Sequence, residues 1–182
     1  LRAVDSAHAS SGLDPAATPA KFAQSADLQH ALRQRFETMA LAKVSTSAAE
    51  ARALDFLAPA DQITMNRDHL IEDARAAAIA LADAGYSAPP PRTVPAAGDA
   101  ALANLKLGIH LMRRAEFISD HDAKVATHIA RIICGGAVTP GSLITEQSLL
   151  DLEREAFLSL CGERKTQERI AYTLKTGKPL RN

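Results

Sequence analysis

Apolar residues recur at spacings of three and four along most of the chain, and apolar and polar residues do not alternate cleanly over four or more positions. Leu28, Leu32, Phe36 and Met39 share one face of a predicted helix that Asp27 would cap. A later stretch has the same spacing at Leu70, Ile71, Ala74, Ala78, Leu81 and Ala82. This periodicity predicts an all-α fold, and the high alanine content agrees with it.

Capping residues mark the ends of several predicted helices. Ser47 followed by Glu50 predicts a capping box, in which the hydroxyl and the carboxylate each bind a free backbone amide. Ser119 followed by Asp122 has the same form. Asn66 is the predicted cap of the long helix, and Gly85 supplies its left-handed stop.

Four helices are predicted in the second half of the chain, over residues 99–115, 119–134, 145–161 and 165–175. Before them, the proline-rich segment Ser87–Gly98 predicts a stiff extended linker. We therefore expect about seven helices in two helical units: residues 1–86, a linker over 87–98, and residues 99–182. In the first unit, Leu1–His8 is interpreted as the end of a helix and Ala9–Ser25 as a second linker.

Charge and composition exclude several classes of protein. Lys and Arg number 21 and Asp and Glu number 21, so the chain lacks the basic excess of nucleic-acid-binding proteins. No apolar run is long enough for a membrane span, and no signal peptide precedes the first helix. We expect a cytoplasmic protein, and the missing initiator Met suggests a piece of something longer.

Histidines and carboxylates give only weak signals of a site. His121 and His128 lie seven residues apart beside Asp120 and Asp122, but no third ligand is placed by spacing, so we expect no metal and exposed histidines. His110 is interpreted as a partly buried structural residue. Two further carboxylates, those of Glu153 and Glu155, are two apart and point to different sides of a helix, so they do not form an acid/base pair. No catalytic residue is predicted.

Cys134 and Cys161 have no CxxC partner and are interpreted as buried free thiols. Gly135 and Gly136 follow a helix rather than a strand, so they predict a C-cap and not a phosphate loop. The basic tail Lys175–Asn182 is open to two interpretations. In the first, the tail would contact an anionic group such as a nucleotide phosphate. In the second, which is favoured, it would be a solvated or subunit-docking tail.

The end of the chain resembles a known C-terminus. The matching segments are Leu152–Leu160, Gly162-Glu163, Lys165–Ile170 and Leu174–Asn182. Upstream, Phe36–Leu57, Asp61–Asp68, Tyr86 with its prolines, Ile118–Lys124 and Cys134–Gly136 agree. They resemble long bacterial 3-hydroxyacyl-CoA dehydrogenases, in which an NAD-binding dehydrogenase is fused to a C-terminal crotonase-like enoyl-CoA hydratase region. Arg164 departs from this pattern, since the family commonly has Pro there.

The resemblance implies that this chain is the C-terminal part of a fatty-acid β-oxidation enzyme whose parent uses NAD and a CoA thioester. Residues 1–86 would be the helical end of the crotonase-like region, and residues 99–182 a helical extension. The crotonase oxyanion hole and the dinucleotide fingerprint have no counterpart in this sequence, so catalysis is assigned to the parent and no cofactor to this piece.

Two hypotheses remain open. The first is a fragment that shapes an acyl-CoA pocket or subunit contacts and packs on the remainder of the parent enzyme. The second is a helical scaffold or oligomerisation module that binds no CoA. Both predict a homo-oligomer, with the face around Leu28–Leu41 as the one most in need of a partner.

Overall fold

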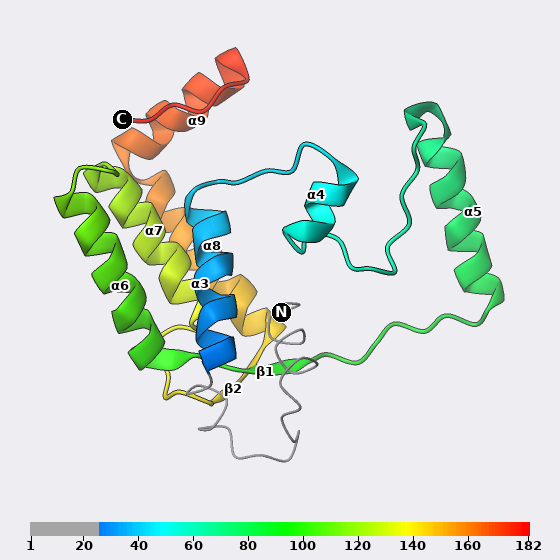
Figure 1. Ribbon diagram of the computed structural model, residues 1–182, viewed down its shortest axis with the longest axis horizontal. Coiled ribbons are helices and arrows are strands. Elements are labelled where there is room, and N and C mark those ends of the chain that lie inside the picture. The colour runs from blue at the N-terminus through cyan, green and yellow to red at the C-terminus, as the bar shows by residue number, and fades with distance from the viewer. Residues whose placement is uncertain (1–25) are drawn as a thin grey trace. The chain divides into compact units, whose positions relative to one another are not determined.

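The computed structural model describes residues 26–182, with side chains from Leu28 onward. The predicted helix end at Leu1–His8 and linker at Ala9–Ser25 lie outside the described residues. Within that part, seven α-helices, one 3-10 turn and two three-residue strands confirm the all-α fold (Figure 1). They are α3 (Ala26–Ala40), α4 (Ala48–Ala53), η1 (Arg67–His69), α5 (Leu70–Asp83), β1 (Thr93–Pro95), α6 (Gly98–Arg114), α7 (Asp120–Ile133), β2 (Leu143–Thr145), α8 (Glu146–Cys161) and α9 (Arg164–Thr176).

The chain divides into two compact units. Among the described residues, unit 1 comprises residues 26–43 together with Arg92–Asn182, and unit 2 is Val44–Pro91. This division differs from the predicted one, which placed α3 with residues 1–86. Helix α3 joins unit 1 because its apolar face needs a partner and α7 provides one. The assignment of the two predicted regions to parts of a longer enzyme stays a prediction.

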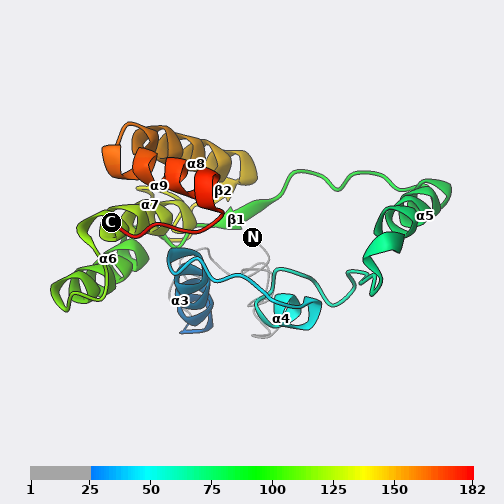
Figure 2. The same cartoon turned by 90° about the horizontal axis from the view of Figure 1, so that it is seen from above.

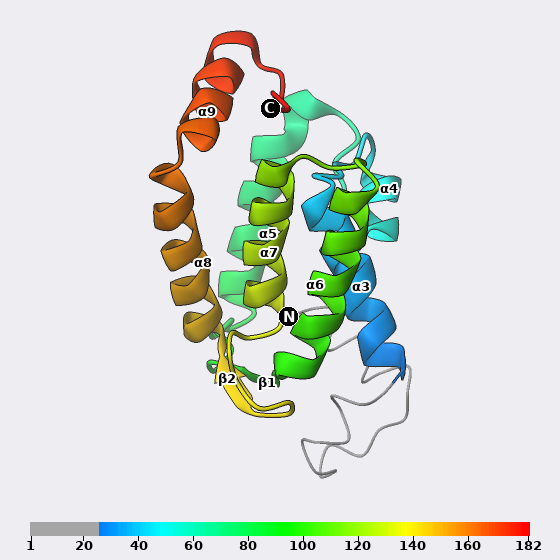
Figure 3. The ribbon, with the colours of Figure 1, turned by 90° about the vertical axis from the view of Figure 1, so that its left-hand side faces the viewer.

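Helix α7 is the centre of unit 1. Figure 3 shows α6 and α8 on its two sides, and Figure 2 shows α3 on the face of α7 opposite α8 and α9. Buried residues of α3, α6 and α7 make one apolar cluster, which includes Phe36, Leu102, Leu105, Ile109, Ala123, Ala126, Ala130 and Cys134. The small alanines of α7 let neighbouring helices approach closely, and Ala130 is fully buried.

A short antiparallel ribbon closes unit 1 at one end. Thr93, Val94 and Pro95 pair with Thr145, Ile144 and Leu143 respectively. Val94, Ala96 and Ala97 are buried, so the second half of the predicted linker belongs to the folded unit instead of spanning free space. The prolines of Ser87–Pro91 precede this point and remain exposed.

Gly98 begins α6 at a place where only glycine fits. Its φ is +69°, a left-handed conformation, and its amide donates to the carbonyl of Cys134 at 3.0 Å. A Cβ atom there would lie 2.6 Å from the nitrogen of Pro140 and 2.7 Å from the carbonyl oxygen of Val138. The close approach ties the start of α6 to the loop after α7.

The predicted helix ends are largely confirmed. Ser119 and Asp122 form a complete capping box, and Gly85 and Gly177 have the left-handed φ that stops a helix. Ser47 Oγ accepts from the Glu50 amide at 3.1 Å, but the Glu50 carboxylate binds Thr46 instead of the Ser47 amide. The prediction that Asp27 is an N-cap is wrong, because the helix already contains Ala26.

Unit 2 leaves its longest helix uncovered. None of the residues of α5 is buried, although its apolar positions follow one face. Ile71 is 84% exposed, and Leu70 and Leu81 are also exposed. On α3, Leu28 and Phe36 are buried within the chain, whereas Met39 and Leu41 are exposed, so the face around Leu28–Leu41 that was expected to need a partner is covered in part. Among the described helices, α5 is therefore one whose whole apolar face is uncovered.

Among the residues that the structure describes, no helix combines the length and apolarity needed to cross a membrane.

Candidate functional site

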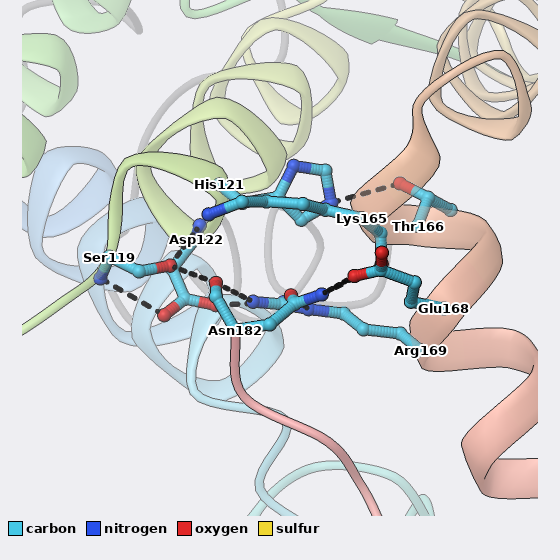
Figure 4. A network of polar contacts seen from close by, with 8 residues as sticks. All are labelled: Ser119, His121, Asp122, Lys165, Thr166, Glu168, Arg169 and Asn182. Atoms are coloured by element: carbon cyan, nitrogen blue, oxygen red, sulfur yellow. Dashed lines mark hydrogen bonds and ion pairs between the residues drawn. The ribbon is translucent and has the colours of Figure 1, made fainter.

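The densest polar network of the described residues joins the start of α7 to α9 and to the last residues of the sequence (Figure 4). Ser119 is the N-cap of α7: its Oγ accepts from the Asp122 amide and its own amide donates to Asp122 Oδ2, both at 3.1 Å. The capping box therefore fixes the Asp122 carboxylate at the positive end of the α7 dipole.

Arg169 of α9 meets this carboxylate. Its Nη1 lies 2.8 Å from Asp122 Oδ1, and the two side chains are only 21% and 22% exposed. Burial raises the pKa of Asp122, but hydrogen bonds from Arg169 and Ser119 outweigh it and hold that pKa below its usual value. The carboxylate is thus a fixed anion that binds α9 to the start of α7.

Asn182 lies over the same pair. Arg169 Nε donates to Asn182 Oδ1 at 2.8 Å, and Ser119 Oγ donates to the Asn182 main-chain oxygen at 3.0 Å. The Asn182 amide nitrogen donates to Glu168 Oε2 at 2.9 Å and to the Lys165 carbonyl at 3.3 Å. The end of the tail is therefore seated against α7 and α9 of the same chain, whereas contact of the tail with another subunit or with an anionic group stays a prediction.

His121 lies in the first turn of α7 and contacts α9. It is 4% exposed, so the expectation that it is exposed at a helix start is wrong: α9 covers it. Its Nε2 lies 2.9 Å from Thr166 Oγ1. A hydroxyl beside an imidazole can form a nucleophile and base, but Asp122 is engaged by Arg169 and does not orient this ring. The pair is best interpreted as a buried helix contact.

The environment of His121 disfavours its protonated form. Burial lowers the pKa of His121, and the cations of Arg169 and Lys165 lower it further. The carboxylates of Glu163 and Asp122 act in the opposite direction and do not cancel this effect. Folding therefore makes His121 a weaker base than in the unfolded chain.

Acid should destabilise the chain through His121. The unfolded chain binds the proton more tightly, so stability is complete above the ordinary histidine value of 6.5 and is lost as the pH falls below it. We expect the difference in unfolding free energy between wild type and His121→Gln to shrink from about pH 7 to about pH 5. Chemical unfolding at several pH values measures this.

The matched control is His128→Gln, which removes an imidazole from the same helix on the side that lines the groove with α8. An identical pH slope in wild type and His121→Gln would contradict the assignment.

The other candidate residues do not converge on one place. His110 is exposed and lines a groove between α6 and α7, so the expectation of partial burial is wrong: it faces away from the cluster that buries Ile109. His128 and Glu153 line an apolar groove between α7 and α8, whereas Glu155 accepts from Arg131 at 2.9 Å. The two glutamates therefore have different surroundings.

The cysteines and glycines agree in part with their interpretation. Both cysteines are free; Cys134 is fully buried, and burial raises the pKa of its thiol to about 12. Cys161 is only half-buried, because it ends α8 near the turn into α9. Gly135 and Gly136 have φ of +85° and +87°, as a C-cap requires. In residues 26–182, no group of three or more His, Cys, Asp or Glu could hold a metal ion.

Sequence reasoning missed the contact of Asp122 with Arg169 and the role of Asn182. A charged residue at the third position of a capped helix signals the capping box, but nothing in the spacing shows which distant cation it meets. The partial burial of both groups follows from the packing of α9 and not from a local pattern.

Comparison with known proteins gives one informative result. No family model matches this chain, and no solved structure matches it. A probable 3-hydroxyacyl-CoA dehydrogenase of Bacillus subtilis (strain 168) is 46% identical over 156 residues, which are 86% of this chain and 20% of that protein. The chain thus spans about a fifth of the length of this relative. The dehydrogenase part of the resemblance is supported: most of this chain is similar in sequence to one segment of a probable 3-hydroxyacyl-CoA dehydrogenase.

Proposed function

We propose that this chain is a non-catalytic helical segment of a longer 3-hydroxyacyl-CoA dehydrogenase, where it supplies contacts within the enzyme and shapes the acyl-CoA pocket. The observation that carries the proposal is the 46% identity over 86% of the chain with a protein of that description.

The exposed face of α5 supports a role in contacts. A free helix with four large apolar side chains exposed is costly in water, and burial of such side chains contributes about 1.5–3 kcal/mol each. In the proposed enzyme, this face packs on the remainder of the polypeptide.

The parent reaction is part of the same proposal. The parent would oxidise a 3-hydroxyacyl-CoA with NAD, and a crotonase-like region would hydrate an enoyl-CoA. Both reactions use groups outside this chain, so a preparation of the 182-residue chain should turn over neither 3-hydroxybutyryl-CoA with NAD nor crotonyl-CoA. Turnover by this preparation would contradict its non-catalytic role.

A transplant tests the contact role. The segment of the Bacillus subtilis relative that matches this chain is replaced by this chain, and dehydrogenase activity and thermal stability are measured. We expect the chimera to be active and Ile71→Asp in it to lower the unfolding temperature and the activity, because a carboxylate would replace a buried apolar side chain. Glu72→Ala, one residue along the same helix, is the matched control and should change neither. Equal behaviour of the two variants would contradict packing through α5.

The second candidate is an oligomerisation module without CoA affinity, and the same α5 face favours it. Sedimentation together with a CoA titration of the 182-residue chain separates the two. Self-association that Ile71→Asp abolishes, with no CoA binding, supports the module, whereas a monomer that binds an acyl-CoA contradicts it.

A further inference from the structure

Helix α6 is covered by its neighbours on one side. Its buried apolar side chains, which belong to the apolar cluster of unit 1, are Ala101, Leu102, Leu105 and Ile109. Figure 2 shows α6 at the edge of unit 1, with α7 and α3 next to it. The side of the helix that faces away from these neighbours is exposed.

Five residues form a stripe along this exposed side. They follow one another at spacings of three, four, four and three residues, which keeps them on one face of an α-helix. The residues of this α6 stripe are Ala100, Ala103, Leu107, Leu111 and Arg114, and all five are exposed. Leu107 and Leu111 are 58% and 59% exposed. Two large apolar side chains one turn apart make the centre of the stripe a surface that gains from burial.

The α6 stripe is symmetric in position about Leu107 but not in size. Ala103 and Leu111 each lie four residues from this centre, on opposite sides of it. Ala100 and Arg114 likewise each lie seven residues from it, so the N-terminal members are small and the C-terminal members are large. An antiparallel copy of the helix, related by a two-fold axis at Leu107, therefore brings the large members of each stripe beside the small members of the other. Large residues beside small ones let two helices pack closely.

The charges at the two ends of the α6 stripe agree with the same arrangement. Asp99 directly precedes Ala100 and is exposed at the start of the helix, whereas Arg114 is exposed at its end. In the antiparallel pair, the long side chain of Arg114 lies over the small Ala100 of the other copy and within reach of its Asp99. In a parallel pair, each Arg114 would face the same cation of the other copy. Unlike charges and the two helix dipoles therefore both favour the antiparallel direction.

We propose that the α6 stripe binds a second copy of this chain, antiparallel and about a two-fold axis at Leu107. A symmetric dimer needs a surface that is complementary to itself, because each copy presents the same residues to the other. A different partner would not require large and small residues at matching distances from one centre. The proposal goes beyond the proposed function, since this interface lies on α6 rather than on α5 and its test has no enzymatic readout.

An exchange of a large and a small residue tests how the two stripes meet. Sedimentation of the 182-residue chain over a range of concentrations gives the dissociation constant of the dimer. Ala103→Leu crowds Leu111 of the other copy and Leu111→Ala leaves a gap, so each should raise this constant by about tenfold. The double variant Ala103→Leu/Leu111→Ala restores the match and should return the constant to within about threefold of wild type. Both positions are exposed, and alanine and leucine are both good helix formers, so the variants keep the fold.

Cysteine cross-linking tests the direction of the two helices. In a Cys161→Ser background, Leu107→Cys should form a disulfide between copies on mild oxidation, because the two residues meet at the axis. The native Cys134 is fully buried and stays reduced. Ala100→Cys should form no such disulfide, because in the antiparallel pair its two copies lie about 20 Å apart along the helices. Cross-linking at both positions would indicate parallel helices and would overturn the proposal.

Ile71→Asp is the comparison variant, because it removes an exposed large apolar side chain from α5 of unit 2 and should leave the α6 dimer unchanged. Self-association that this variant abolishes would place the interface on α5 and overturn the proposal. A double variant no tighter than Ala103→Leu or Leu111→Ala alone would do the same. So would a monomer at all concentrations, which would leave the proposed function standing because the remainder of a longer polypeptide would then cover the stripe.

Discussion

Gly98→Ala should destabilise unit 1 by about 3 kcal/mol or more. Alanine at a φ of +69° costs about 1–2 kcal/mol. The larger part comes from the new Cβ, which would lie 2.6 Å and 2.7 Å from backbone atoms of Pro140 and Val138. Because backbone atoms cannot turn away as a side chain can, the α6 start and the loop after α7 would have to separate. Urea unfolding followed by circular dichroism measures the effect.

Gly177→Ala is a matched control for this prediction. Gly177 also has a φ of +69°, but a Cβ there meets nothing within 4 Å. Its substitution should cost only the conformational part, about 1–2 kcal/mol. A loss at Gly98 no larger than that at Gly177 would contradict the role assigned to the close approach. If Gly98→Ala does not fold at all while Gly177→Ala does, the same ranking is obtained from soluble yield and proteolysis.

Arg169→Ala should destabilise the chain by about 2 kcal/mol. The Asp122 side chain, which is 22% exposed beside Arg169, loses its cation in this variant, and the side-chain oxygen of Asn182 loses the Nε donor of Arg169. Removing one partner of a partly buried pair costs more than an exposed pair contributes, because the remaining charge stays out of water. Chemical unfolding of the folded variant measures this loss.

Arg164→Ala controls for the loss of one arginine from the same helix. Arg164 pairs with Glu168 at 3.3 Å but is 87% exposed, so its removal should cost less than about 0.5 kcal/mol. Arg169→Lys should fall between the two, since it keeps the charge but not the donors that reach both Asp122 and Asn182. Equal effects of Arg164→Ala and Arg169→Ala would show that the network of Figure 4 contributes little.

Helices and their ends could be predicted from the sequence because both are local. The spacing of apolar residues in α6 and α7, and the Ser119–Asp122 capping box, depend on residues within a few positions of one another. The predicted bounds of these helices differ from the observed ones by about one residue, within the usual uncertainty of helix ends.

The grouping of helices could not be predicted in the same way. The prolines of Ser87–Gly98 indicated a boundary, yet Val94 and Ala97 are buried because β2, far along the chain, pairs with β1. Likewise, α3 belongs with α7 because of complementary surfaces and not because of sequence distance. The exposure of His110 on α6 depends on these same tertiary contacts.

In the candidate site, too, local features could be predicted from the sequence and tertiary contacts could not. The basic character of the tail was evident from Lys175–Asn182, but the place that Arg181 occupies depends on where Asn182 docks. The pairing of Asp122 with Arg169 was not predicted either, because it depends on how α9 packs against the start of α7.

Both ends of unit 2 connect to unit 1, since Lys43 and Arg92 border it on either side. Residues 44–91 are therefore an insertion between α3 and β1, and unit 1 folds by closing a loop across them. The entropy lost on closure grows only with the logarithm of loop length, by about 0.6 kcal/mol for each doubling. A segment in this position can lengthen, shorten or change its sequence at little cost to the helices that enclose its ends. Evolution can thus fit this insertion to a new neighbour while α3, α6 and α7 keep their packing.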